Sequence, residues 1–66
     1  MQILLNGEAY VAEPGITVSG LLDQLELAGK RVAVEVNQEL VPRSEHLDRQ
    51  LNAGDQVEVV QAIGGG

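Results

Sequence analysis

The chain has 66 residues, enough for one domain, with ten acidic and four basic side chains, a formal net charge of −6 and no cysteine. A domain of this size buries only about 60% of the surface that its unfolded chain exposes, which argues against a large internal catalytic pocket. The missing cysteine excludes disulfides and thiolate metal sites, and the negative charge together with a single aromatic residue disfavours nucleic-acid binding.

A β-hairpin is predicted at the start of the chain. Residues 1–5 and 8–12 flank Asn6-Gly7, and Asn-Gly between two such runs is the strongest short-range hairpin signal. Residues 13–15, Glu-Pro-Gly, then end the second strand, because Pro fixes φ and Gly permits a turn.

An amphipathic helix follows. Thr17 is its predicted N-cap. Apolar residues recur at helical spacing at Val18, Leu21, Leu22 and Leu25. Residues 28–29, Ala-Gly, are the predicted stop, and Lys30 and Arg31 supply the positive charges that suit a helix C-terminus. Gly20 within the helix indicates close packing against the sheet.

Two further strands are predicted after the helix. Residues 32–36 alternate between apolar and other side chains, which is the period of a half-buried strand. Asn37-Gln38 turns the chain into a short strand at residues 39–41. Pro42 restricts that strand to an edge or an end of the sheet, because it cannot donate a ladder hydrogen bond.

A short helical turn and a last strand complete the pattern. Ser44 is predicted to cap the turn, with Leu47 and Leu51 as its apolar anchors and His46 as a solvated side chain. The turn cluster at residues 52–55 leads into the last strand at residues 56–61.

The order β-β-α-β-β-β predicts an α+β domain, a ubiquitin-like β-grasp with a mixed four- or five-stranded sheet covered by one helix. The last strand lies beside the first and parallel to it. Strand alternation places five side chains against the helix: Met1, Ile3, Leu5, Val57 and Val59. Leu4 and Val60 fall side by side on the open face. The predicted domain covers residues 1–63, and residues 64–66 form a flexible tail.

The tail is the predicted functional site. Gly64, Gly65 and Gly66 lack a Cβ, so they can lie extended in a channel too narrow for other residues. From the Cα of Ile63 the last Cα can reach roughly 10 Å, far enough to present a terminal carboxylate inside another protein's active site. Gly66 is therefore the predicted acyl site.

The sequence contains no conventional catalytic set, because it has one His and no Cys and lacks the glycine patterns of nucleotide sites. We therefore expect a substrate of enzymes that binds no cofactor or metal itself, with ATP and Mg used by an activating enzyme. Adenylation would turn the carboxylate oxygen into a leaving group. Attack by a persulfide would then give a thiocarboxylate, whereas attack by a lysine would make the domain a covalent tag.

Several segments resemble the ThiS family of thiamine-biosynthesis sulfur carriers, and the resemblance covers essentially the whole chain. They are residues 32–37, the Val-Pro-Arg-Ser of residues 41–44, Leu51 with Gly54-Asp55, residues 57–66, and the helix pattern at residues 17–25. The Gly-Gly end is common to all ubiquitin-like carriers, whereas Val-Pro-Arg-Ser combined with this length is more selective. Gln38 departs from the family, which often has Gly there, and this leaves the type of that turn open.

The resemblance implies a carrier whose Gly66 is adenylated by an E1-like adenylyltransferase, converted to a thiocarboxylate and used as sulfur donor to thiazole synthase. The sulfur would come from a cysteine-desulfurase persulfide or a related donor. Leu4, Val60 and Ile63, with Gly64 and Gly65, are the predicted partner-binding residues.

No stretch approaches the ~20 apolar residues of a membrane helix, and no basic-then-apolar leader opens the chain. We therefore expect a soluble, cytoplasmic protein that is a monomer when free and binds neither membranes nor nucleic acids.

Three other functions are compatible with the tail. The small subunit of molybdopterin synthase is a similar carrier, but it is usually longer and differs in the segments quoted above. A ubiquitin-like modifier would carry Gly66 in isopeptide linkage to lysines. A non-covalent β-grasp module would keep its function without Gly65 and Gly66.

Overall fold

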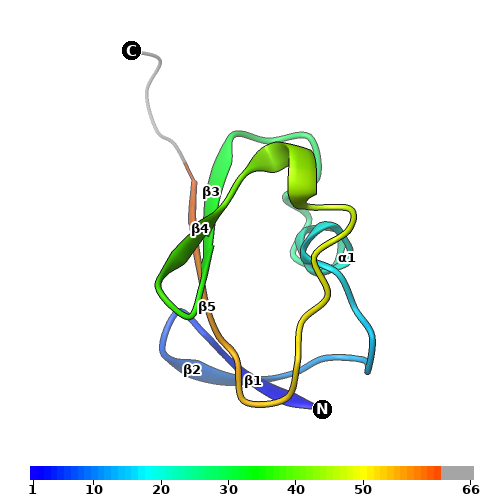
Figure 1. The fold of residues 1–66 in the computed structure, drawn as a ribbon, viewed down its shortest axis with the longest axis vertical. Coiled ribbons are helices and arrows are strands. Elements are labelled where there is room, and N and C mark those ends of the chain that lie inside the picture. Colours follow the sequence, from blue (N-terminus) through cyan, green and yellow to red (C-terminus); the bar gives the residue numbers. More distant parts are fainter. Residues whose placement is uncertain (62–66) are drawn as a thin grey trace.

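A computed structural model describes residues 1–61 of the chain (Figure 1). Its elements are β1 (Gln2–Leu5), β2 (Glu8–Val11), α1 (Val18–Gln24), β3 (Val32–Val36), β4 (Glu39–Val41), a 3₁₀ turn (Arg43–Glu45) and β5 (Gln56–Gln61). This is the predicted order, and the predicted bounds of the last strand are confirmed.

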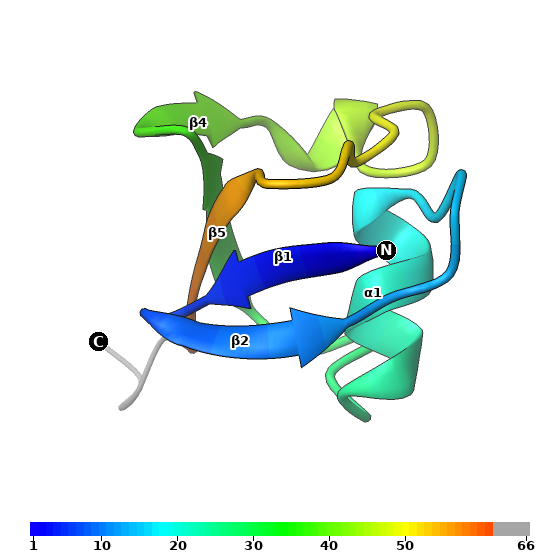
Figure 2. The ribbon, with the colours of Figure 1, turned by 90° about the horizontal axis from the view of Figure 1, so that it is seen from below.

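The five strands form one mixed sheet in the order β2-β1-β5-β3-β4. The last strand, β5, lies beside β1 and parallel to it, as predicted. It occupies the centre of the sheet, with β3 antiparallel on its other side. The short β4 lies at an edge, where the proline after it removes no hydrogen bond from a neighbouring strand. Figure 2 shows α1 on one side of this sheet, so the helix and the sheet form two layers.

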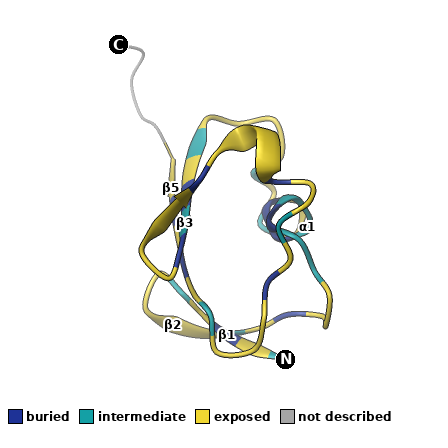
Figure 3. Cartoon of the chain, viewed as in Figure 1, coloured by how far each residue is buried: buried dark blue, intermediate teal, exposed yellow. Residues whose placement is uncertain are grey.

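The hydrophobic core lies between these two layers (Figure 3). Its buried members are Ile3, Ala12, Val18, Leu21, Leu22, Val34, Val36, Val41, Leu51, Val57 and Val59. Met1 and Leu5 are partly buried against this cluster. The predicted inward face of β1 and β5 is therefore confirmed, because both strands turn alternate residues toward α1.

The start of the helix agrees with the prediction, but its end does not. The Thr17 Oγ1 accepts a hydrogen bond from the Gly20 nitrogen at 3.1 Å, which makes Thr17 the N-cap. A Cβ on Gly20 would lie 3.0 Å from Cγ1 of Ile16, so the close packing at this glycine is against Ile16 and not against the sheet.

The helix ends at Gln24, five residues before the predicted glycine. Glu26 takes a φ of 60°, and two hydrogen bonds close the end: Glu26 N–H to Asp23 O at 3.0 Å and Leu27 N–H to Leu22 O at 2.8 Å. This is the Schellman arrangement, formed here with a non-glycine residue in the left-handed region. Lys30 and Arg31 therefore lie beyond the helix, whose last turn contains no basic residue.

The connection from β4 to β5 differs from its prediction in three side chains. Ser44 is not a cap, because the 3₁₀ turn begins after Pro42 and has no side-chain cap. Leu47 is 76% exposed, whereas His46 is 8% exposed and its Nε2 lies 3.1 Å from the carbonyl oxygen of Val41. The turn thus directs the histidine inward and the leucine outward. Leu51 is buried, as predicted.

Both hairpin turns have two consecutive residues with positive φ, which is the type I′ geometry. The angles are 50° at Asn6 and 84° at Gly7 in the first turn, and 52° at Asn37 and 71° at Gln38 in the second. The departure at Gln38 therefore does not change the type of turn. It places a side chain where glycine would be unstrained.

Candidate functional site

The predicted acyl site lies outside the described residues. This applies to Gly64, Gly65 and Gly66, to Ile63 and to the predicted boundary between domain and tail. The strand that leads to them, β5, is described through Gln61. Of the predicted partner-binding residues, Leu4 and Val60 have a defined place.

The C-terminal half of β5 is held on both sides by different means. On one side, β3 pairs with β5 as far as Gln61, which lies opposite Val32. On the other side, the pairing with β1 covers Gln56 and Val57, and the side chain of Asn6 then extends it. The Asn6 Oδ1 accepts from the Val59 nitrogen at 2.9 Å, and its Nδ2 donates to the Val59 oxygen at 3.3 Å.

Leu4 and Val60 share the open face of the sheet, but they are not neighbours. Leu4 lies opposite Gln56, whereas Val60 lies opposite Ala33 on the other side of β5. These two levels are four residue steps apart along β5, or about 13 Å at roughly 3.3 Å per step. The prediction that they lie side by side is wrong. The cause is the register of β5 against β1, which matches Leu4 to the start of β5.

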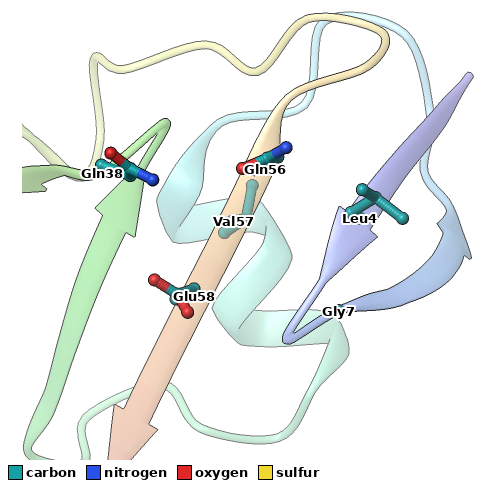
Figure 4. A pocket seen from close by; sticks show the side chains of 6 residues that line it. All are labelled: Leu4, Gly7, Gln38, Gln56, Val57 and Glu58. Atoms are coloured by element: carbon teal, nitrogen blue, oxygen red, sulfur yellow. The ribbon is translucent and has the colours of Figure 1, made fainter.

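Leu4 borders a hollow near the start of β5, at the opposite end of that strand from Gln61 (Figure 4). The hollow is lined by Leu4, Gly7, Gln38, Gln56, Val57 and Glu58. Figure 4 shows the side chains of Gln56 and Glu58 projecting from β5 between Gln38 and Leu4. Leu4 thus lies among polar side chains and is 38% exposed. Val60 is 64% exposed and lies one residue before the end of β5.

The open face carries two more exposed apolar side chains that the sequence analysis did not single out. Val11, 81% exposed, lies opposite Gln2 at one edge, and Leu40, 65% exposed, lies opposite Glu35 at the other. The alternation of residues 8–11 and 39–41 contained this signal, because Tyr10 and Val41 occupy the inward positions.

Two carboxylates face each other in the middle of this open face. Glu35 of β3 and Glu58 of β5 are direct cross-strand partners. Like charges in this position destabilise an antiparallel pair. The open face therefore combines an acidic centre with apolar side chains around it, a pattern suited to binding a protein surface that is both apolar and basic.

The family of the chain follows from comparison with known proteins. The model of the ThiS family matches residues 3–66, nearly the whole chain. The chain belongs to the ThiS family. The sulfur carrier protein ThiS of Escherichia coli is 39% identical over 66 residues, which cover all of both chains. A crystal structure of the thiamine biosynthesis protein ThiS from Geobacter metallireducens superposes on all of this chain with a TM-score of 0.85 at 30% identity.

Similarity extends to a larger protein as well. A thiazole synthase of Magnetococcus marinus is 48% identical over the 66 residues, and this chain spans only a fifth of that protein's length. The ThiS match, with its five-stranded mixed sheet and one helix, confirms the ubiquitin-like β-grasp fold.

Two features of the described residues bear on other kinds of site. Residues 1–61 hold no group of three or more His, Cys, Asp or Glu placed to bind a metal ion. No helix in this part of the chain has the length and apolar character needed to cross a bilayer.

Proposed function

We propose that this ThiS-family chain is the sulfur carrier of thiazole formation in thiamine biosynthesis. The observation that carries the proposal is the end-to-end match with the E. coli sulfur carrier, which runs through the glycines. The chain is then a protein co-substrate and not an enzyme. Gly66 is its reacting residue.

The chemistry at the Gly66 carboxyl group proceeds in three steps. A carboxylate oxygen attacks the α-phosphorus of ATP in an E1-like enzyme that holds the Mg, and pyrophosphate leaves. The terminal sulfur of a cysteine-desulfurase-type persulfide then attacks the acyl carbon, and AMP leaves. A second thiol cleaves the resulting acyl disulfide, which releases the thiocarboxylate and leaves a protein disulfide.

The consumer of this sulfur is thiazole synthase. Support comes from the thiazole synthase of Magnetococcus marinus, a longer protein that contains a stretch similar to this chain. A carrier and a synthase that occur in one chain would have their reacting groups held at high effective concentration.

The open face and the root of the tail form the proposed docking surface for both partners. Leu4, Val60 and Ile63 are its apolar contacts, and Gly64 and Gly65 enter the active-site channel. The levels of Leu4 and Val60 are about 13 Å apart along β5, so one interface of standard size, roughly 800 Å² per partner, can cover both residues. The two partners therefore compete, and Leu4→Lys or Val60→Lys weakens both adenylation and sulfur transfer while the thermal midpoint stays near that of the wild type.

ATP–pyrophosphate exchange with the cognate activating enzyme tests the proposed acyl site. The wild-type chain is expected to support exchange, and a variant without Gly66 is not. A Gly66→Ala variant keeps the carboxylate in place and reports how narrow the channel is. Undiminished exchange without Gly66 would contradict the proposed acyl site. Simultaneous binding of both partners to one carrier would contradict the shared docking surface.

A further inference from the structure

A hollow beside the end of β5 combines two guanidinium groups with an apolar floor. It is lined by Arg31, Val32, Ala33, Arg43 and Val60. Both arginines are exposed, as is Val60. Arg43 donates from Nη2 to the carbonyl oxygen of Lys30 at 3.4 Å, a long and exposed bond. Because a guanidinium has five N–H donors, this bond leaves most donors of Arg43 without a hydrogen-bond partner among residues 1–61.

The charge of this hollow opposes that of the chain as a whole. The chain has four basic residues and a net charge of −6, yet three of the four lie at this end of the sheet: Lys30, Arg31 and Arg43. Glu35 and Glu58 lie one row of open-face side chains further from the tail than Ala33 and Val60. The sign of the charge therefore reverses along β5, from acidic to basic, toward the tail.

The position of the hollow matters because the tail begins only a few residues beyond β5. Five residues come after Gln61, and they span at most about 17 Å when extended. A protein that encloses the carboxylate of Gly66 in its active site must therefore cover the surface around the end of β5. This step rests on the proposed function.

We propose that Arg31 and Arg43 bind carboxylate side chains of the activating enzyme beside the mouth of the channel that takes the tail. The planar fork of arginine matches a carboxylate in bidentate geometry, and the apolar floor at Val60 lowers the exposure of such a pair to water. The arginines thus set the direction in which the carrier docks. If the carrier docked in the reversed direction, the enzyme's carboxylates would face Glu35 and Glu58 and would be repelled by them.

Single charge reversals test the proposal in ATP–pyrophosphate exchange, with the concentration of the carrier varied at low ionic strength. Arg31→Glu and Arg43→Glu are each expected to raise the KM for the carrier roughly tenfold, with kcat little changed. Arg49→Glu, outside the hollow, is the matched control, because it changes the net charge equally. A second control is Gln50→Glu with Ala53→Glu, two exposed positions with the same total change of charge.

The sign of the effect separates this proposal from general electrostatic steering. All of these variants are more acidic than the wild type. If the enzyme attracted the carrier only through a basic face, all of them would therefore bind the enzyme better than the wild type does. Lower or unchanged KM values for Arg31→Glu and Arg43→Glu, in variants that melt like the wild type, would overturn the proposal. Conservative Arg→Lys changes at both positions keep the charge, and their intermediate KM would report the loss of bidentate geometry.

The same experiment distinguishes a failure of the arginine docking site from a failure of the proposed function. If the wild-type chain supports no exchange with the activating enzyme, the proposed function fails. If the wild type supports exchange and the reversals at both arginines leave its KM unaltered, only the docking site fails.

Discussion

Asn6→Gly isolates the contribution of one side chain to the strand that carries the tail. Asn6 has a φ of 50° in the first hairpin turn, and glycine accepts that angle without strain. The substitution therefore keeps the backbone of the turn and removes both hydrogen bonds between the amide of Asn6 and the backbone of Val59. Among the described residues, these two bonds alone connect the part of β5 after Val57 to the β1 side of the sheet.

The expected loss of stability is about 1–2 kcal/mol. A hydrogen bond contributes about 0.5–1.5 kcal/mol net, and the bond from Nδ2, at 3.3 Å, belongs at the low end of that range. The extra freedom of glycine in the unfolded chain adds to the loss, whereas relief of the positive φ of asparagine offsets part of it. In a domain of this size the whole free energy of unfolding is only several kcal/mol.

Urea unfolding measures the global loss, and amide hydrogen exchange locates it. In Asn6→Gly the Val59 amide should exchange about 5 to 30 times faster than in the wild type, the factor that corresponds to 1–2 kcal/mol. Asn37→Gly is the matched control, because the Asn37 side chain binds the Gln56 nitrogen and Asp55 at the other end of β5. A wild-type midpoint and a protected Val59 amide in Asn6→Gly would refute the reasoning.

Three other changes have expected outcomes in the same unfolding assay. Gln38→Gly should raise the free energy of unfolding by about 0.5 kcal/mol, because the gain from a φ of 71° exceeds the entropic cost of glycine; a decrease would contradict the strain at this turn. Glu26→Gly should raise the free energy of unfolding by a similar amount, because Glu26 has a φ of 60° at the end of the helix. A lower free energy of unfolding would show that the Glu26 side chain matters more than its backbone angle. Val59→Ala should cost about 1–3 kcal/mol, and Leu25→Ala, which is only partly buried, about 1–2 kcal/mol; wild-type midpoints for both would overturn their placement in the core.

Most of the fold could be predicted because its signals are local. The hairpin at Asn6-Gly7, the N-cap at Thr17 and the alternation of β3 and β5 each depend on residues a few positions apart. The parallel placement of β5 beside β1 followed from the order of elements, since one helix must cover one face of the sheet.

The errors arise where an unusual backbone angle or a tertiary contact decides the structure. The helix ends at Gln24 because the backbone N–H groups of Glu26 and Leu27 close it there, although a glutamate at positive φ gives no sequence signal. His46 turns inward because the Val41 oxygen offers its ring a partner, and Leu47 is left outside. The separation of Leu4 from Val60 depends on the register between strands distant in sequence, which alternation alone does not specify.

The arginine hollow shows a different limit of sequence reasoning. Arg31 and Arg43 are separated in the chain by β3 and β4, and in the sequence they stand out only as a helix-end charge and as part of a family motif. The pairing of β3 with β5 and the path of the chain after Pro42 bring both beside Val60. Such a site is visible only after the sheet is assembled.

The most direct test of the central claim is the intact mass of the protein purified from its own host. If Gly66 carries the sulfur, a fraction of the molecules should show one oxygen replaced by sulfur, and fragmentation should place the sulfur at the C-terminal residue. This species should vanish from cells that lack the activating enzyme. A C-terminus found only as carboxylate in cells that are making thiamine, or Gly66 found in isopeptide linkage to lysines, would contradict the account.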